Sequence, residues 1–486
     1  MVGAGIGGLA AAARLARQGH RVTVCEQAPR VGGKLGLLAR DGFRFDTGPS
    51  LLTMPHVFEE LFAATGDPMA SVLTLRPVDP VARYRFGDGT GFEASSDLPT
   101  MVANLDRLSP GSGARWVRFL DRAARTWAAS RRPFLESALD GPRSLVTRDT
   151  RPRDLVAISP WLTLRRLARR HFDDPRLVTF VDRYATYTGS DPRRAPAALA
   201  VVPYVEHTFG AWYVEGGLTR LGDALADRAV ACGARVRTGT DVVQVETAGG
   251  RVDGVRLADG GRLPAEVVVA NVDARVLYET LVHDARAEQA RHRMRRASPS
   301  LSGFVLLLGV RGRTPGLRHH TVLFPRDYDA EFDDLFGPRP RPVRDPTLYV
   351  SVPDDPAVAP ADHEAWFVLV NAPRQGQGDV DWDEPGLRER YADGLMALLA
   401  TRGLDLGDRV LFREIITPSD LERRTRAIGG AIYGTSSNGA RAAFLRPANR
   451  SPVPGLFLVG GSSHPGGGLP LVALSARIVS DLVGPA

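Results

Sequence analysis

The apolar residues near the start of the chain are spaced first for a helix and then for a strand. After the first glycines, apolar side chains recur at intervals of three and four residues up to Gly19, which predicts an amphipathic helix. The segment HRVTVCE then alternates apolar and polar positions, which predicts a strand that finishes on Glu26. The apolar positions of the expected helix are Leu9, Ala12, Ala13 and Ala16.

Three glycines open this helix with the spacing G-x-G-x-x-G, namely Gly3, Gly5 and Gly8. Such glycines let the backbone approach a pyrophosphate, and the N-terminus of the following helix supplies free N–H groups and a positive dipole. An acid at the end of the next strand, here Glu26, binds ribose hydroxyls. The pattern therefore predicts a dinucleotide site rather than an empty strand-to-helix turn.

The strand that should lead into this loop is almost missing, since only Met1 and Val2 precede Gly3. In sheets of this kind the first strand is central and needs about five apolar residues. We therefore expect that the natural start lies several codons upstream, and that the chain as given binds its cofactor more weakly.

A second pair of glycines distinguishes between the dinucleotide cofactors. Directly after Glu26, the sequence QAPRVGGKLG places two glycines beside two cations, and DGFRFDTGPSLL adds a strand and a Gly-Pro turn. Nicotinamide dehydrogenases have no need of such a pair, whereas flavin enzymes turn the chain back along the extended dinucleotide at this point. The succession predicts FAD. The residues concerned are Arg30, Gly32, Gly33, Lys34, Gly48 and Pro49.

Two later parts of the chain are predicted to return to the same domain. A helix, a glycine and a strand recur over 227–238, and a hairpin turn is expected at Asp259–Gly260. Residues 455–461 are predicted as a buried strand and 470–482 as a helix whose N-terminus stabilises the anionic edge of a reduced flavin. Between them, His464 is expected to be a loop histidine bonded to backbone rather than a catalytic base.

The composition is that of an ordinary folded protein with two or three domains. Of 486 residues, 43% are hydrophobic and 24% charged, with neither an apolar run long enough to span a membrane nor a secretory leader. Cys25 and Cys232 lie far apart, so neither a metal site nor a disulfide framework is expected, which favours a reducing compartment.

The net charge of +7 comes from arginine, since Lys34 is the only lysine among 62 basic residues. A genome biased toward G and C explains this excess, and attraction to an anionic membrane surface is the alternative. Nucleic-acid binding is not expected, because the sequence has no stripe of interleaved aromatic and basic residues and no recognition helix.

Together these segments resemble the bacterial carotenoid desaturase family, the phytoene-desaturase-like FAD enzymes, over nearly the whole chain. The glycine loop and Glu26 are shared by many flavoproteins, whereas GAWYVEGGLTRL and FLVGGSSHPGGGLPLVALSARI are much more particular to this family. The segments RYATYTGSDP and FLRPANRSPVPGLFLV lean slightly toward the branch of acyclic carotenoid 3,4-desaturases.

The resemblance implies an FAD site built from three segments of backbone. The implied contacts are Gly3, Gly5 and Gly8 on the pyrophosphate; Glu26 on the adenosine ribose; Arg30, Gly32, Gly33 and Lys34 along the phosphates and ribityl chain; Gly48 and Pro49 beside the flavin ring; Val242 on the adenine through its backbone; and Gly461, Ser462, Gly468 and Leu469 on the flavin side.

The expected fold is α/β: a Rossmann-like FAD-binding domain of the glutathione-reductase/amine-oxidase type, assembled from discontinuous segments, with a mixed β-sheet substrate domain and a helical membrane-facing subdomain. The FAD-binding segments are expected at 1–75, 212–285 and 415–486. Residues 76–211 would begin the substrate domain and carry its helical subdomain, and 286–414 would form its sheet.

The helical subdomain contains a candidate membrane contact, ISPWLTLRRLARRHF at 158–172. A helical wheel places its apolar residues on one arc and its arginines on the other, which suits the bilayer interface. A solvated helix packed on its own domain is the alternative, and the family favours the membrane because its substrates dissolve only in lipid. The apolar arc is Trp161, Leu164, Leu167, Ala168 and Phe172; the arginines are Arg165, Arg166, Arg169 and Arg170.

The resemblance implies desaturation of an acyclic carotenoid. A CH–CH unit flanked by double bonds would give a hydride to flavin N5, and the neighbouring carbon would then lose a proton. In PYVEHTFGAW, Glu206 and His207 are the candidate catalytic residues, as proton acceptors or cation stabilisers. The alternative is that both are polar groups at a domain seam.

The expected partners are a lipophilic carotenoid, the inner face of the cell membrane, to which the protein attaches peripherally from the cytoplasm, and quinone or oxygen as electron acceptor. A carotenoid oxygenase, ketolase or isomerase of the same family stays open, as does a non-catalytic flavin or carotenoid carrier. An amine oxidase is disfavoured, because Lys34 belongs to the glycine-pair segment and Phe457 is the sole aromatic residue of 450–486.

Overall fold

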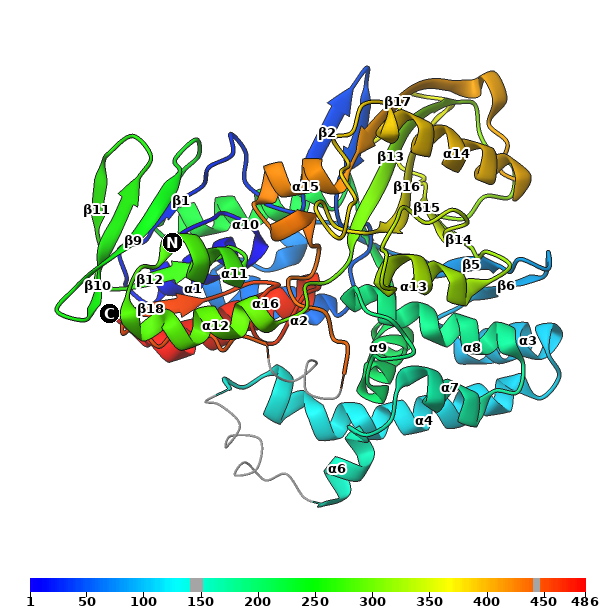
Figure 1. Ribbon diagram of the computed structural model, residues 1–486, viewed down its shortest axis with the longest axis horizontal. Coiled ribbons are helices and arrows are strands. Elements are labelled where there is room, and N and C mark those ends of the chain that lie inside the picture. The colour runs from blue at the N-terminus through cyan, green and yellow to red at the C-terminus, as the bar shows by residue number, and fades with distance from the viewer. Residues whose placement is uncertain (140–151, 440–445) are drawn as a thin grey trace.

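A computed structural model describes residues 1–139, 152–439 and 446–486 and shows three parts (Figure 1). A parallel sheet with its helices carries both ends of the chain, a seven-stranded sheet lies beside it, and a group of helices lies below that sheet in the view shown. Elements from the beginning, the middle and the end of the chain meet in the first part. The predicted α/β fold assembled from discontinuous segments is confirmed.

The parallel sheet joins segments that are far apart in sequence. Its strands pair in parallel as β1 (Thr23–Cys25) with β8 (Arg235–Arg237), and as β12 (Val268–Ala270) with β18 (Leu456–Leu458). Val2 forms parallel bridges to Cys25 and Ala270 and so joins the two pairs. The position expected for the first strand is therefore filled by Met1 and Val2, and the Met1 ammonium donates to the Thr23 oxygen at 2.9 Å.

Helices cover this sheet through small side chains. Ala10, Ala11, Ala12 and Ala13 of the first helix are fully buried, and the absence of longer side chains lets neighbouring helices approach closely. Both α10 and α16 pack against α1. The helices of this part are α1 (Ile6–Arg17), α2 (Pro55–Thr65), α10 (Thr219–Ala231), α11 (Ala274–Val276), α12 (Glu288–Arg296) and α16 (Leu469–Val483).

Two small antiparallel sheets complete the first part. The hairpin predicted at Asp259–Gly260 is confirmed, since it joins two antiparallel strands of a three-stranded sheet. The strands of that sheet are β9 (Val242–Ala248), β10 (Arg251–Leu257) and β11 (Arg262–Pro264), and the second sheet is the hairpin β2 (Leu37–Arg40) and β3 (Phe43–Asp46).

The seven-stranded sheet has the order β17-β13-β16-β15-β14-β5-β6, and only the pairing of β14 with β5 is parallel. Its central strands are buried on both faces, which explains the continuous apolar run SGFVLLLGV. The strands are β5 (Ala82–Arg85), β6 (Gly91–Ala94), β13 (Ser302–Arg311), β14 (His320–Leu323), β15 (Leu348–Ser351), β16 (His363–Ala372) and β17 (Val410–Ile416). Helices α13 (Tyr328–Phe336), α14 (Leu387–Thr401) and α15 (Pro418–Thr425) lie against or beside it.

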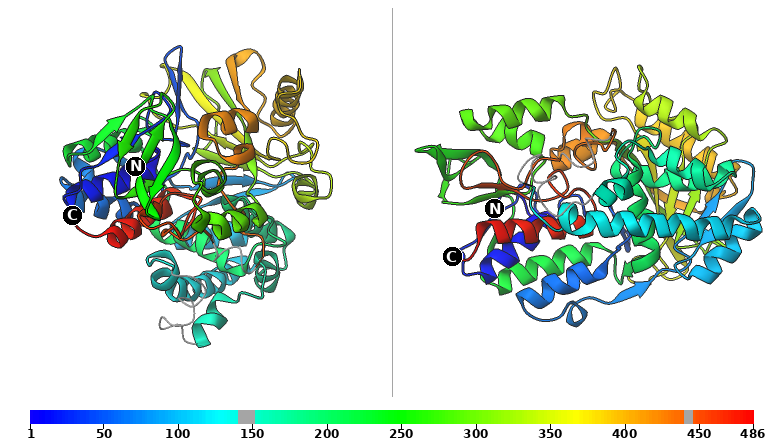
Figure 2. Two further views of the ribbon diagram at one scale, coloured as in Figure 1. Left: turned by 60° about the vertical axis from the view of Figure 1, so that its left-hand side comes forward. Right: turned by 90° about the horizontal axis from the view of Figure 1, so that it is seen from below.

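The helical part forms one end of the molecule, away from the β2–β3 hairpin (Figure 2, left view). A strand pair, β4 (Leu75–Pro77) and β7 (Trp212–Val214), lies where the chain passes between the parts. The helices are α3 (Leu98–Leu108), α4 (Ser112–Ser130), α6 (Pro152–Ile158), α7 (Leu164–His171), α8 (Pro175–Asp182) and α9 (Val201–Phe209).

The helix predicted within 158–172 is shorter than expected, and the alternative in which it packs on its own domain is confirmed. Arg165, predicted on its polar face, is buried and paired with Asp182 and Asp329. The chain forms two helices, α6 and α7, with a turn between them, and Trp161 lies in that turn with 64% of its surface exposed. The remaining apolar residues of the predicted arc pack into the core of their own domain, because α8 and the turn after Pro192 cover them. Those residues are Leu164, Leu167, Ala168 and Phe172.

No helix in the described parts of the chain is both long enough and apolar enough to cross a membrane.

Candidate functional site

The first glycine loop is a close crossing of backbone that excludes side chains. A Cβ atom on Gly8 would lie 2.2 Å from the Gly3 carbonyl oxygen, and Gly3 itself has a φ of +91°. Gly5 is the N-cap of α1, and no side chain caps the helix there. The first N–H groups of α1 are therefore available to an anion, as a phosphate cradle requires.

Glu26 fixes this loop from the adjacent strand. Its carboxylate accepts hydrogen bonds from the N–H of Ala4 at 2.7 Å and from the N–H of Ala28 at 2.9 Å. The N–H of Thr240 donates to the Glu26 carbonyl at 2.7 Å, which brings the segment before Val242 beside it. The residues predicted to hold the ribose and the adenine thus lie together, although they come from different segments.

The second glycine pair packs against the first loop. The Gly32 N–H donates to the Ala4 carbonyl at 2.9 Å, and a Cβ on Gly33 would lie 3.2 Å from the Cα of Gly5. Arg30, in contrast, is exposed and lies 4.0 Å from the carboxylate of Asp223. The glycines at this point are required by the packing of two backbone loops.

Lys34 joins the first segment to the last one. Its ammonium donates to the carbonyl oxygens of Ala431 at 2.8 Å and Ile432 at 2.6 Å. Desolvation lowers the pKa of Lys34 to about 8. The next turn is equally tight, since a Cβ on Gly48 would lie 2.0 Å from the Lys34 carbonyl oxygen.

The third segment offers a second open helix terminus. Gly468 is the N-cap of α16 with a φ of +110°, no side chain caps the helix, and a Cβ there would meet no atom within 4 Å. Ser462 accepts from the N–H of Ala274 at 2.9 Å, and Gly461 lies close to Gly467. Leu469 is buried in the core between α1 and α16, so its side chain holds the helix in place.

Two further residues at this site, the partly buried Asn271 and the buried Arg446, were not predicted from the sequence. The Asn271 side chain fills the space beside the glycine loop, with its Nδ2 2.6 Å from the place of a Cβ on Gly5. Arg446 donates to the carbonyl oxygens of Tyr433 at 2.7 Å and Gly461 at 2.9 Å, and burial lowers its pKa to about 10. Neither residue stands in a motif that names its partners, which lie far away in sequence.

His464 is bonded to backbone, as predicted. Its Nε2 lies 2.9 Å from the Ser137 carbonyl oxygen, the side chain is buried, and burial lowers its pKa to about 4. The imidazole is therefore neutral near pH 7 and ties the C-terminal loop to the helical part.

The two predicted catalytic residues lie in different surroundings on α9. Glu206 is 5% exposed and accepts a hydrogen bond from the Tyr184 hydroxyl at 2.6 Å; burial raises its pKa to about 6. His207 lies near Ser95 and Asp97, and burial lowers its pKa. The structure therefore places only Glu206 in the buried polar cluster that includes Tyr184.

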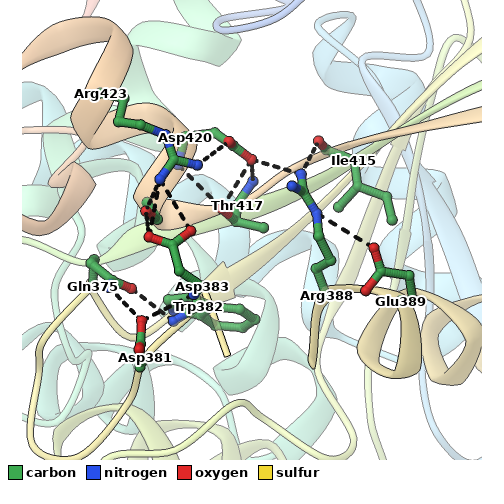
Figure 3. Close-up of polar contacts among 11 residues, drawn as sticks. Gln375, Asp381, Trp382, Asp383, Arg388, Glu389, Ile415, Thr417, Asp420 and Arg423 are labelled. Atoms are coloured by element: carbon green, nitrogen blue, oxygen red, sulfur yellow. Dashed lines mark hydrogen bonds and ion pairs between the residues drawn. The ribbon is translucent and has the colours of Figure 1, made fainter. Parts of the chain in front are cut away.

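A network of ion pairs anchors α15, the helix that leads from the sheet to the carbonyl groups bound by Lys34 (Figure 3). The Arg423 guanidinium lies between Asp383, at 3.0 Å, and Asp420, at 2.6 Å. Asp420 also accepts from Arg388 at 2.9 Å and completes a capping box with Thr417. Helix α15 is thus held by Arg388 of α14 and by Asp383 in the loop before α14.

The residues at the two glycine loops and at the start of α16 fit an extended dinucleotide. Two uncapped helix N-termini supply donors for anionic groups, and the glycines leave no side chain in the way. These residues come from three distant segments of the chain.

Comparison with known proteins also supports a dinucleotide site. A family model described as flavin containing amine oxidoreductase matches residues 6–484. A 4,4'-diapolycopene oxygenase of Methylomonas sp is 35% identical over 99% of this chain and 97% of its own length. A zeta-carotene-forming phytoene desaturase of Myxococcus xanthus is 37% identical, over 99% and 92%. A 1-hydroxycarotenoid 3,4-desaturase of a Flavobacterium species is 31% identical, over 99% and 98%.

The fold also matches a solved structure. An oxidoreductase from Methanosarcina mazei superposes with a TM-score of 0.66 at 18% identity and covers 98% of both chains. At that identity the likeness describes the arrangement of the chain alone.

Proposed function

Because the chain belongs to the family of flavin-containing amine oxidoreductases, and to the carotenoid desaturases and oxygenases within it, we propose that it desaturates an acyclic carotenoid with FAD. FAD is its cofactor and the chain is an oxidoreductase. The observation that carries the proposal is the meeting of three glycine-lined segments, from the beginning, middle and end of the chain, which supports a single dinucleotide site between them. The lean toward 3,4-desaturases stays a prediction.

The reaction removes one hydride and one proton from adjacent carbons and leaves a new double bond between them. FAD, when bound, supplies the hydride acceptor. The resulting cation is delocalised over the polyene, so the proton on the neighbouring carbon is acidic and needs only a weak base. Glu206, with a pKa of about 6, is ionised at neutral pH and is our candidate for that base or for a stabiliser of the cation. His207 is the second candidate.

The affinity for the carotenoid must come from the burial of apolar surface, since a hydrocarbon chain offers no hydrogen-bond acceptor or donor. Burial of a methylene group contributes about 0.8 kcal/mol, so the shape of the channel orients the substrate.

We further propose that the outer end of the helical part attaches to the inner face of the cell membrane. Leu155 and Val156 of α6 and Trp161 in the next turn are exposed by 48%, 62% and 64%. Helix α6 lies at the lower edge of the molecule in Figure 1 and in the left view of Figure 2. Exposed arginines follow on α7, which suits an anionic lipid surface. Quinone or oxygen would then reoxidise the cofactor.

Anaerobic mixing of the purified holoenzyme with acyclic carotenoids in vesicles tests the proposal. A desaturase loses its oxidised flavin absorption while the polyene absorbs at longer wavelength. A non-catalytic carrier changes neither spectrum, and this outcome would contradict the proposal.

The oxygenase is the second candidate, because the relative from Methylomonas is 35% identical over nearly the whole chain. Mass spectrometry of the product after reaction in air separates the two. A desaturase lowers the product mass by two hydrogens, whereas an oxygenase adds oxygen.

A further inference from the structure

One asparagine side chain lies where the first and the third FAD-binding segments meet. Asn271 directly follows β12, and its backbone N–H donates to the Val2 carbonyl at 2.8 Å. A Cβ on Gly5, the N-cap of α1, would lie 2.6 Å from the Asn271 Nδ2. A Cβ on Gly460, two residues after β18, would lie 2.4 Å from its Oδ1. The side-chain amide is therefore placed between the start of α1 and the last glycine-lined segment.

The first turn of α1 also packs directly against this amide. A Cβ on Gly7 would lie 2.9 Å from the Asn271 Oδ1, and a Cβ on Gly8 would lie 3.2 Å from its Nδ2. Both glycines belong to the first turn of the helix. Because contacts this short exclude a larger side chain at either glycine, the amide of Asn271 is a polar group held against the backbone at the helix start.

The protein leaves the hydrogen-bonding capacity of this amide unused. The group carries two N–H donors and an acceptor oxygen. In the parts of the chain that the structure describes, neither its nitrogen nor its oxygen forms a hydrogen bond with another residue. The side chain is half-buried, so it retains surface that a ligand can contact. A donor fixed by packing at this place suits an anionic oxygen.

The topology places the amide on the edge of the sheet where a ligand is expected. Glu26 directly follows β1, Gly460 lies two residues after β18, and Asn271 directly follows β12. In open parallel sheets, ligands bind at the carboxyl ends of the strands. The amide of Asn271 thus lies on the same edge as the glycine loop and the acid predicted to bind the ribose.

We propose that Asn271 binds the diphosphate of FAD, with its Nδ2 donating an N–H to a phosphate oxygen at the start of α1. The uncapped N–H groups of α1 supply further donors to the same group. An amide is neutral, so Asn271 contributes a hydrogen bond and no charge. This inference rests on the FAD part of the proposed function and is independent of which carotenoid is the substrate.

Two substitutions of Asn271 separate a phosphate contact from a packing role. Asn271→Asp keeps the shape of the side chain but replaces the amide donor by a carboxylate, whereas Asn271→Ala removes the donor and the volume together. A carboxylate repels a diphosphate, so a phosphate contact predicts weaker FAD binding by Asn271→Asp than by Asn271→Ala. Packing alone predicts the opposite order, because alanine leaves a cavity and aspartate does not.

Fluorescence titration of the full-length apoprotein with FAD measures both variants. We expect the Kd to rise about tenfold in Asn271→Ala and about a hundredfold in Asn271→Asp. ADP, which carries the diphosphate without a flavin, should compete with FAD in the same order. In 1 M salt the Kd of Asn271→Asp should approach that of Asn271→Ala, since salt screens the repulsion. A folding defect would not be relieved in this way.

Asn104→Asp is the matched control, because Asn104 is also half-buried but lies on α3 in the helical part. It should leave the Kd for FAD unchanged. FAD binding by Asn271→Asp that equals or exceeds binding by Asn271→Ala would overturn the inference and leave the proposed function standing. If the native protein binds no FAD, the proposed function fails and the inference fails with it.

Discussion

Arg426 and Asp241 form a bidentate ion pair beside the parallel sheet, with the guanidinium nitrogens 2.8 Å and 2.7 Å from the two carboxylate oxygens. Arg426 ends α15 in the left-handed region, at a φ of +56°, and Asp241 directly precedes the strand that begins at Val242. The pair therefore joins the end of α15 to the start of β9, whose first residue, Val242, is predicted to contact the adenine.

Loss of this pair should weaken FAD binding moderately. Both side chains are partly exposed, and ion pairs of this kind stabilise a structure by up to about 1 kcal/mol. Arg426→Ala should therefore raise the Kd for FAD about two- to fivefold. The effect should shrink in 1 M salt, which screens the pair. Titration of the apoprotein with FAD measures it. Arg390→Ala removes an ion pair to Glu384 at 3.0 Å that joins no separate segments, and it should leave the Kd unchanged. Equal effects of the two substitutions would contradict this explanation.

A methyl group at Gly8 should abolish tight binding of FAD. The added Cβ would lie 2.2 Å from the Gly3 carbonyl oxygen, and backbone cannot move aside without opening the phosphate loop. We expect Gly8→Ala to raise the Kd for FAD at least tenfold in fluorescence titration. The control is Gly394→Ala within α14, where a Cβ meets no atom within 4 Å. It should keep the Kd and stabilise the helix by about 1 kcal/mol. FAD bound normally by Gly8→Ala would show that the loop carries no phosphate.

These glycines could be predicted from the sequence because the residues that require each of them lie only a few positions away. Gly3, Gly5 and Gly8 surround one turn, and Glu26 ends the next strand, so local spacing is enough. Arg446 has no such signal, since the carbonyl oxygens that it binds belong to Tyr433 and Gly461, which lie 13 and 15 residues away in sequence. Its role depends on what the fold brings together.

For α7, the sequence predicts which residues form the apolar face but not which elements pack against it. Helical spacing correctly groups Leu164, Leu167 and Phe172 on one face, but it does not say what covers that face. The helices of the same domain cover it, and Trp161, outside the helix, is left exposed.

The pH dependence of turnover should follow Glu206. Burial raises its pKa to about 6, so the carboxylate is protonated as the pH falls through 6 and can no longer accept a proton. If Glu206 is the base, kcat should fall about tenfold for each pH unit below 6, and Glu206→Gln should remove this limb and lower kcat at pH 8. Stopped-flow measurement of flavin reduction gives the rate. A native pH profile retained by Glu206→Gln would exclude Glu206, and His207→Ala then tests the other candidate.

The same group should cost stability at neutral pH. The pKa of this carboxyl is raised from 4.5 to about 6 on folding, so between these pH values the folded state binds more protons than the unfolded state. The free energy of unfolding therefore falls as the pH rises from 4.5 to 6, and it stays at the lower value above pH 6. Glu206→Gln keeps an acceptor for Tyr184 and removes this cost, about 2 kcal/mol at pH 8. We expect the variant to melt above the native protein at pH 8 and level with it at pH 4. A lower melting temperature at both values would show that the carboxylate is needed for folding.

Membrane attachment should depend on the exposed apolar residues beside α7 rather than on the helix predicted from the sequence. Replacement of Leu155, Val156 and Trp161 by serine removes apolar surface that is already in contact with solvent, so the fold should be unaffected while binding to anionic vesicles falls at least tenfold in co-sedimentation. Val230→Ser is the control, since Val230 is 54% exposed on α10 in the FAD-binding part. If the triple variant sediments like the native protein, attachment occurs elsewhere. If neutral vesicles bind as well as anionic ones, the arginines of α7 contribute nothing and apolar insertion alone holds the protein at the bilayer.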